Sequence, residues 1–182
     1  AQVEPIRTYL RPFVRPDKYA SLCQGWRYPV YSLYLDSPVL DCLRATEEGH
    51  KNRFKLRLRL YSAGPGGLAF FEVKRRMDRL IRKHRASLPW TDADAFLHGG
   101  PLPRASLNPA AVEELDRFRE MTRSAQAAPV VWVHYTREVY VSAAGEPVRL
   151  NFDTELGHAA AGADGLACAA ARWRPTPLPG VI

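Results

Sequence analysis

Two hydrophobic patterns of different period open the chain. Apolar residues recur at helical spacing within Glu4–Val14, which predicts a helix that starts near Pro5 and ends before Pro16. The run Tyr28–Leu35 is rich in aromatic and β-branched residues instead, and it predicts a strand. Acidic residues followed by glycine then indicate a short helix over residues 39–49.

A strict alternation follows between Phe54 and Leu60, where aromatic or aliphatic residues take every second position and cations take the others. This pattern is typical of a strand with one apolar and one cationic face. A glycine-rich turn at Ser62–Gly67 leads into a second alternating strand, in which Phe71 and Val73 face one side. The partners on the other side are Glu72, Lys74 and Arg76, and a third alternation, Arg79, Ile81, Lys83 and Arg85, extends the cationic surface.

The second half of the chain predicts fewer elements. Residues 87–106 show no clear period and are interpreted as a loop with at most one helical turn. Asn108-Pro109 suits the start of a helix that ends near Ala125. Strands are expected over residues 130–141 and 148–153, with arginines at alternate positions. The alanine-rich stretch 159–171 is helical or disordered, and residues 181–182 resemble the beginning of another strand.

Charge is concentrated in the same region as the alternating strands. Lys51–Arg85 holds twelve of the 26 lysines and arginines and only two acids, so it carries net +10 while the remaining residues sum to −3. Arginine outnumbers lysine 21 to 5, and the planar guanidinium suits bidentate phosphate contacts. One interpretation is a solvated sheet face. The other, which we favour because like charges across strands repel, is a surface that binds a polyanion.

Composition excludes several classes of protein. There is no run of about 18 apolar residues to span a membrane, and the N-terminus shows no signal-peptide pattern. We therefore expect a cytoplasmic protein of one domain. Cys23, Cys42 and Cys168 are odd in number and far apart, which indicates neither a disulfide framework nor a zinc site. The five histidines lie at unrelated spacings and form no catalytic triad signature.

These patterns predict an α+β fold in which an antiparallel β-barrel with a cationic interior is flanked by helices. The apolar strand faces would then pack outward against the helices. Burying many positive charges without partners is very costly, so the tunnel should be wet and hold a polyanion. Nucleic acid is disfavoured because the basic strands carry few aromatic residues on which bases could stack.

The order of the motifs carries a family resemblance. YPVYSLYLDSP, EEGHKNRFKLRLRLY, FFEVKRRMDRLIRKHRA, VHYTREVY and VRLNFDTEL, in this order, closely resemble the VTC domain. This is the polyphosphate polymerase module of the triphosphate tunnel metalloenzyme, or CYTH-like, superfamily. The resemblance covers about Ile6 to Ile182. It implies a tunnel that binds ATP and polyphosphate with Mn²⁺ or Mg²⁺ and transfers the γ-phosphate of ATP to a growing phosphate chain.

The resemblance also implies roles for individual residues. Matching motifs assign the proposed catalytic set Arg57, Arg59, Lys74, Arg137 and Arg149. Further phosphate-binding residues are Arg76, Lys83 and Tyr135 by motif, and Lys55 and Arg85 by alternation alone. Glu72 is the best metal-ligand candidate because it shares a face with Lys74; the alternative is an ion-pair partner that holds the cations in place. Asp36 and Asp153 are weaker candidates, since each follows a strand where turn capping is common.

The family pattern includes two strands that this sequence does not contain. Its first strand, with an E-x-K-Y pattern, and its last, with an LE-x-K pattern, have no counterpart here, so we expect residues 1–182 to form a single tunnel domain that lacks both. A hydrolytic tripolyphosphatase remains an alternative function. So does a non-catalytic module that binds polyphosphate, inositol phosphates or nucleotides, and a membrane-protein partner is left open.

Overall fold

The structure is a computed structural model of the chain. It describes residues 3–64, 66–162, 165–168, 171–177 and 180–181. The fold separates into two compact units. The central unit comprises Tyr31–Trp132 and Ala159–Arg172, and the terminal unit comprises Ala1–Val30, Val133–His158 and Trp173–Ile182. Strands β2 (Arg27–Asp36) and β6 (Ala128–Ser142) run through both units, which are treated separately below.

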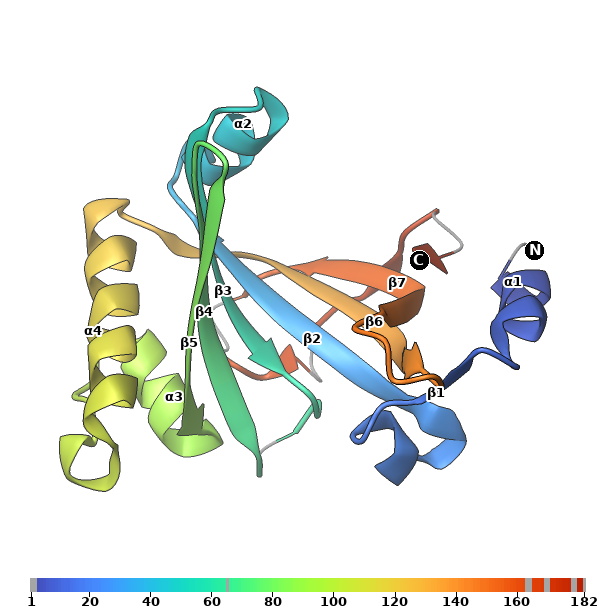
Figure 1. The fold of residues 1–182 in the computed structure, drawn as a ribbon. Helices are drawn as coiled ribbons and strands as arrows, with labels where there is room; N and C mark the ends of the chain where they lie inside the picture. The colour runs from blue at the N-terminus through green and yellow to red at the C-terminus, as the bar shows by residue number, and fades with distance from the viewer. Residues whose placement is uncertain (1–2, 65, 163–164, 169–170, 178–179, 182) are drawn as a thin grey trace. The chain divides into compact units, whose positions relative to one another are not determined.

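The sheet of the central unit is antiparallel, in the order β5-β4-β3-β2. Its strands β3 (Asn52–Leu60), β4 (Leu68–Met77) and β5 (Leu80–Pro89) confirm the three alternating segments (Figure 1). The register aligns Leu33 with Leu58, Leu58 with Phe71 and Phe71 with Ala86. Every second side chain of a strand therefore lies on the same face, and the aligned residues of neighbouring strands form apolar rows across the sheet.

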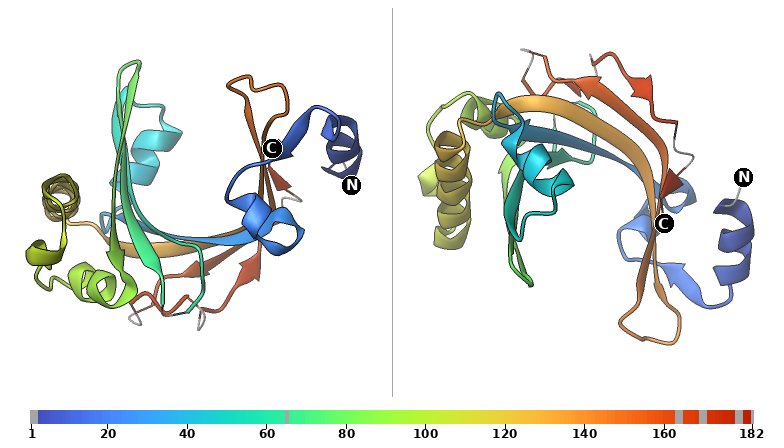
Figure 2. Two further views of the ribbon diagram at one scale, coloured as in Figure 1. Left: turned by 60° about the horizontal axis from the view of Figure 1, so that its bottom comes forward. Right: turned by 90° about the horizontal axis from the view of Figure 1, so that it is seen from above.

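Helices cover this apolar face. After β5, the chain forms α3 (Trp90–Leu97) and α4 (Pro109–Ser124), both of which contact β4 and β5 (Figure 2). The ring of Phe71 lies edge-on to Phe96 of α3 and to Phe118 of α4, with both centroid distances 5.1 Å. The expectation that apolar strand faces pack against helices is confirmed for this unit, and burial of these rings contributes to its stability.

Polar side chains fix two helix starts. Asn108 accepts a hydrogen bond from the Ala111 backbone at 2.8 Å, which confirms the predicted N-terminus of α4. The carboxylate of Asp36 accepts hydrogen bonds from the backbone N–H groups of Ser37, Cys42 and Leu43. It thereby holds the first turn of α2 (Asp41–Glu47), the short helix expected after the first strand.

The terminal unit is built on β6 and β7 (Arg149–Ala160). β1 (Val14–Pro16) pairs antiparallel with β6, and β8 (Arg174–Pro175) and β9 (Gly180–Val181) pair with β7. The unit also contains α1 (Val3–Leu10) and the 3₁₀ helices η1 (Ala20–Leu22) and η2 (Gln24–Trp26). The strand expected at residues 181–182 is present at Gly180–Val181; residue 182 lies outside the described residues.

Three local expectations need correction. The first helix ends at Leu10, and Val14 joins β1 because it pairs with Ser142. The stretch 87–106 is not mainly loop: β5 continues to Pro89 opposite Leu68, and α3 and the 3₁₀ helix η3 (Arg104–Ser106) follow. The described residues of 159–171 form no α-helix, and Ala159 and Ala160 extend β7; residues 163–164 and 169–170 lie outside the description.

The predicted α+β class with an antiparallel sheet and flanking helices is confirmed. The sheet is not closed into a barrel over the described residues, since its hydrogen-bonded path ends at β5 and at β8. Among the helices of the described residues, none has the length and apolar character needed to cross a lipid bilayer.

The three cysteines provide a chemical test of the fold. Burial raises the pKa of the Cys42 thiol to about 12 and that of Cys168 to about 11, and both side chains are buried. Because the thiolate is the reactive form, iodoacetamide at pH 8 should label only Cys23 in the folded chain and all three thiols in urea. Peptide mass spectrometry would read this out, and rapid native labelling of Cys42 or Cys168 would contradict the packing.

Candidate functional site

Cations from three adjacent strands share one face of the central sheet. The register places every second residue of β3, β4 and β5 on the side opposite Leu58 and Phe71, away from α3 and α4. We call this surface the cationic face, and its eight cations are Arg53, Lys55, Arg57, Arg59, Lys74, Arg76, Lys83 and Arg85. The structure thus brings together all seven of the cations predicted for the site from this region.

Three lysines of this face stand directly abreast. Lys55 of β3 pairs with Lys74 of β4, which pairs with Lys83 of β5. All three are exposed. Lys83 reaches Glu72 at 2.9 Å, but within the described part of the chain no carboxylate lies within ion-pair distance of Lys55 or Lys74. Like charges directly across a strand pair are destabilising, so this lysine row contributes an unfavourable electrostatic energy to the fold.

The next row contains the only acid of the described face, Glu72, between Arg57 and Arg85. Glu72 is 1% exposed. Its Oε2 accepts a hydrogen bond from Arg57 Nε at 2.6 Å, while Oε1 lies 2.9 Å from Lys83 Nζ and 3.4 Å from Arg85 Nε. Burial disfavours the charged carboxylate, but the attraction of Arg57, Lys83 and Arg59 outweighs it and lowers the pKa of Glu72.

This geometry bears on the metal expectation. Both oxygens of Glu72 already face cations, and a divalent ion would have to displace them. The described residues contain no group of three or more histidine, cysteine, aspartate or glutamate side chains placed to hold a metal. The contacts therefore fit Glu72 better as the ion-pair partner of Arg57 and Lys83, and its role as a metal ligand stays a prediction.

Neutral groups also contact the arginines of this face. Arg59 is buried, with Nε 3.3 Å from Ser32 Oγ, and the guanidinium of Arg57 also donates to Tyr34 at 3.3 Å. Arg85 lies over the ring of Phe70 at 3.9 Å. Arg76 donates to the backbone oxygen of Asp78. Sequence reasoning missed Ser32 and Tyr34, although their alternation on one face of the first strand was a usable signal.

The other predicted residues lie in the terminal unit. Arg137 of β6 makes a bidentate pair with Asp153 of β7, with both N–O distances 2.7 Å. These hydrogen bonds raise the pKa of the Arg137 guanidinium further above its usual value. The guanidinium also lies 5.0 Å from the ring centre of Tyr135. Asp153 therefore orients an arginine. This role differs from both roles considered from the sequence, which were turn capping and metal binding.

Arg149 is bound less completely. It reaches Asp17 at 3.1 Å, yet its side chain remains 57% exposed. Asp17 is buried and also accepts hydrogen bonds from the backbone of Tyr19 and Ala20. Arg149 and Arg137 thus each have a carboxylate partner, so an incoming phosphate must compete with that partner.

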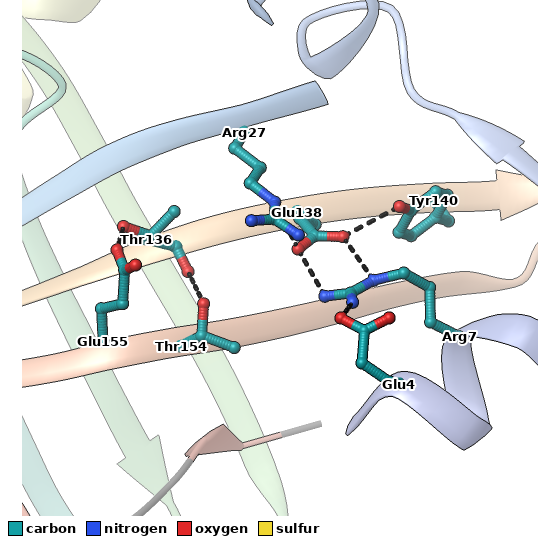
Figure 3. Close-up of polar contacts among 8 residues, drawn as sticks. All are labelled: Glu4, Arg7, Arg27, Thr136, Glu138, Tyr140, Thr154 and Glu155. Carbon is teal, nitrogen blue, oxygen red and sulfur yellow. Dashed lines mark hydrogen bonds and ion pairs between the residues drawn. The ribbon is translucent and has the colours of Figure 1, made fainter. Parts of the chain in front are cut away.

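A second cluster in the terminal unit was not predicted at all. Glu138 is 1% exposed and lies between two arginines: Arg7 of α1 contacts it at 3.0 and 2.7 Å, and Arg27 of β2 at 2.9 Å (Figure 3). Tyr140 donates to the same carboxylate at 2.9 Å, and Glu4 pairs with Arg7. The overlooked signal was Glu138 itself, an acid in the apolar run of β6. It follows Arg137 directly and therefore lies on the other face of the strand.

This cluster ties α1 to the strands beside it. Burial works against the charge of Arg7, but Glu4 and Glu138 outweigh it and raise the pKa of the guanidinium. Burial and the hydrogen bond to Glu138 also raise the pKa of Tyr140. Next to the cluster, Thr136 donates to Glu155, whose φ of 55° is left-handed, and Thr154 donates to the backbone of Thr136 (Figure 3). Glu138 therefore connects α1, β2 and β6 on the face of β6 opposite Arg137.

Comparisons with known proteins agree with the motif order. The VTC domain family matches residues 1–177. Among solved structures, a Bacillus halodurans protein provisionally assigned as an adenylate cyclase matches with a TM-score of 0.48 and 11% identity, over 90% of this chain and 70% of that one. Similarity at this level carries no information about substrate. No curated protein matches the chain.

The chain belongs to the VTC domain family. This membership places it among phosphate-transferring modules of the tunnel-fold type and implies use of a divalent metal ion. The cationic face described above carries guanidinium and ammonium groups, which are the groups that commonly bind phosphate in proteins.

The Glu72 ion pairs predict a specific pH dependence. Because the folded-state pKa of Glu72 is lowered, its contribution to stability is fully present above its ordinary value near 4.5 and is lost as pH falls through the folded-state pKa. Glu72→Gln should therefore lower the free energy of unfolding by about 2–4 kcal/mol at pH 7, with a smaller difference at pH 3. Urea unfolding at both pH values would measure this.

Glu113→Gln is the matched control, since Glu113 makes an ion pair on α4 but is 71% exposed. We expect a change below about 0.5 kcal/mol there. An equal effect of the two variants, or a Glu72→Gln deficit that grows toward low pH, would contradict the assignment.

Glu138 should also be important for stability, because this buried carboxylate accepts hydrogen bonds or ion pairs from Arg7, Arg27 and Tyr140 at once. We expect Glu138→Gln to lower the free energy of unfolding by about 2 kcal/mol, whereas Glu146→Gln on an exposed turn should have little effect. Denaturant titration of both variants measures this, and similar midpoints for the two would show that the cluster is dispensable.

Proposed function

We propose that this chain binds a phosphate chain on its cationic face and transfers the γ-phosphate of ATP to the end of that chain, as a polyphosphate polymerase. The observation that carries the proposal is the lysine row Lys55–Lys74–Lys83. Neighbouring strands lie about 4.8 Å apart, so the row spans roughly 10 Å. A linear polyanion laid across the strands meets all three ammonium groups at once.

The cations of the face differ in exposure and in whether a carboxylate already binds them. Lys55 and Lys74 are exposed and have no carboxylate partner among the described residues, so they bind phosphate without breaking an ion pair. Lys83, Arg85 and Arg57 each share Glu72. An arriving phosphate would compete with Glu72 for Lys83 and Arg85, which are more exposed than Arg57, while Arg57 and Arg59 line the base of the face.

The reaction asks for positioning and charge neutralisation more than for acid–base chemistry. A terminal phosphate oxygen of the acceptor chain attacks the γ-phosphorus of ATP, a new P–O bond forms, and the bond to the β-phosphate oxygen breaks to release ADP. The attacking oxygen is already anionic, so no general base is needed. In the proposal, Arg57, Arg59 and Lys74 stabilise the transferring group, with Arg137 and Arg149 as further catalytic residues.

The remaining phosphate-binding set comprises Lys55, Arg76, Lys83, Arg85 and Tyr135. The family implies Mn²⁺ or Mg²⁺ as the metal ion, but Glu72 is a poor fit for it because its oxygens already face Arg57 and Lys83. No step is therefore assigned through a metal. ATP and polyphosphate are the proposed partners, and a cytoplasmic location stays a prediction.

A second candidate function is a non-catalytic module that binds polyphosphate or another phosphate-rich anion. It is favoured by the same contacts of Glu72, which commit the one described acid of the face to holding cations. The two functions predict the same binding residues and differ only in turnover.

The lysine row provides the direct test. Lys55→Ala with Lys74→Ala should weaken tripolyphosphate binding by about tenfold per lysine, because each charged contact is worth about 1.5 kcal/mol. Binding should also weaken as salt rises. Isothermal titration calorimetry with tripolyphosphate measures both effects, and both lysines are exposed, so the fold should survive.

Arg75→Ala is the matched control, since Arg75 neighbours Lys74 on β4 but lies on the opposite face. With ATP and Mn²⁺, the wild type and Arg75→Ala should form an acid-labile phosphate polymer, whereas Arg57→Ala with Arg59→Ala should not. Binding without polymer in the wild type would favour the binding module. Unchanged tripolyphosphate affinity in the double lysine variant would overturn both functions.

A further inference from the structure

The tip of the β4–β5 hairpin combines exposed aliphatic residues with exposed cations. Its two strands remain paired up to Met77 and Leu80, and Asp78 and Arg79 form the turn. Leu80 is 50% exposed and Ile81 is 55% exposed. The turn lies at the opposite end of the hairpin from α3 (Figures 1 and 2). Two consecutive aliphatic side chains, one on each face of the hairpin, are therefore exposed to solvent at its end.

Cations surround these two side chains on both faces of the hairpin. Lys74 and Lys83 belong to the lysine row, whereas Arg75 and Arg82 pair with each other on the opposite face. With Arg76 and Arg79, residues 74–83 contain six cations and one acid. Among the described residues, no carboxylate lies within ion-pair distance of Arg75, Arg79 or Arg82. The phosphate site on one face does not explain arginines on the other.

Hydrogen bonds hold the tip in this shape. The backbone N–H of Asp78 donates to the Lys51 oxygen at 3.1 Å, which connects the turn to the start of β3, and Arg76 donates to the Asp78 oxygen at 2.8 Å. Asn52 also pairs with Met77. The exposed Leu80 and Ile81 are thus presented by a braced turn, so they lose little conformational freedom when they bind a surface.

We propose that this hairpin tip docks on an anionic lipid bilayer, with Leu80 and Ile81 entering the interface between headgroups and acyl chains and with Arg79 and Arg82 contacting lipid phosphates. Basic residues beside exposed apolar side chains are the combination that binds negatively charged membrane surfaces. Each cation near such a surface strengthens binding by about fivefold. The site lies next to the lysine row and does not depend on its activity.

A bilayer fits these observations better than a soluble polyanion does. A free phosphate chain would be bound by the cations but would leave Leu80 and Ile81 in water, whereas a bilayer buries them and neutralises both faces of the tip together. A protein partner would have to offer acidic groups on both sides of an apolar slot. An anionic bilayer provides both negative charge and an apolar interior over its whole surface.

The test is vesicle flotation of the purified chain with phosphatidylcholine alone and with phosphatidylcholine containing about one third phosphatidylserine. Leu80→Ser with Ile81→Ser, and separately Arg79→Ser with Arg82→Ser, should each reduce binding to anionic vesicles by tenfold or more. The matched controls are Leu22→Ser with Val148→Ser, which removes two other exposed aliphatic residues, and Arg11→Ser with Arg15→Ser, which removes two exposed arginines of the terminal unit.

A fluorescent variant separates lipid insertion from phosphate binding. The emission of tryptophan in Leu80→Trp should shift to shorter wavelength with anionic vesicles and should not shift with tripolyphosphate. Selective loss of binding in the two tip variants, together with this shift, supports the proposal. Absence of binding to anionic vesicles, equal binding to neutral vesicles, equal losses in the controls, or no shift with vesicles would overturn it.

Discussion

Repulsion between cations on neighbouring strands is the constraint that shapes the central unit. Lys55, Lys74 and Lys83 face one another across β3, β4 and β5, and one buried carboxylate, Glu72, serves three of the cations on the same face. A sheet with this arrangement is stable only if another interaction offsets the repulsion. That interaction lies on the opposite face, where Phe71 packs against Phe96 and Phe118. The apolar face stabilises the fold, whereas the cationic face keeps an excess of positive charge.

The terminal unit deals with its charges differently. Arg137 and Arg149 each have a carboxylate, Asp153 and Asp17, and on the other side of β6 the buried Glu138 binds two arginines. These four arginines therefore already have carboxylate partners in the absence of ligand. Under the proposed function, substrate binding depends mainly on the lysine row, because a phosphate would have to displace a carboxylate from each of these arginines.

Much of the central unit could be predicted from the sequence, because residues such as Phe54 to Leu60 alternate strictly and a period of 2 determines which side chains share a face. α3 could not be predicted, since Phe96 is fixed by packing on Phe71 rather than by local periodicity. The alternation also suggested Glu72 as a metal candidate without showing its three cations. Asp153 and Glu138 depend on contacts between strands and helices that are distant in sequence, and no local pattern reports such contacts.

The chain contains only five lysines, so lysine footprinting tests the central claim directly. Acetylation followed by mass spectrometry, with and without tripolyphosphate, measures the reactivity of each amine. The account predicts strong protection of Lys55, Lys74 and Lys83 by tripolyphosphate and unchanged reactivity of Lys18, which lies beside Tyr19 in the terminal unit. Equal protection of Lys18, or full reactivity of Lys55 and Lys74 in the presence of tripolyphosphate, would contradict a phosphate site on the cationic face.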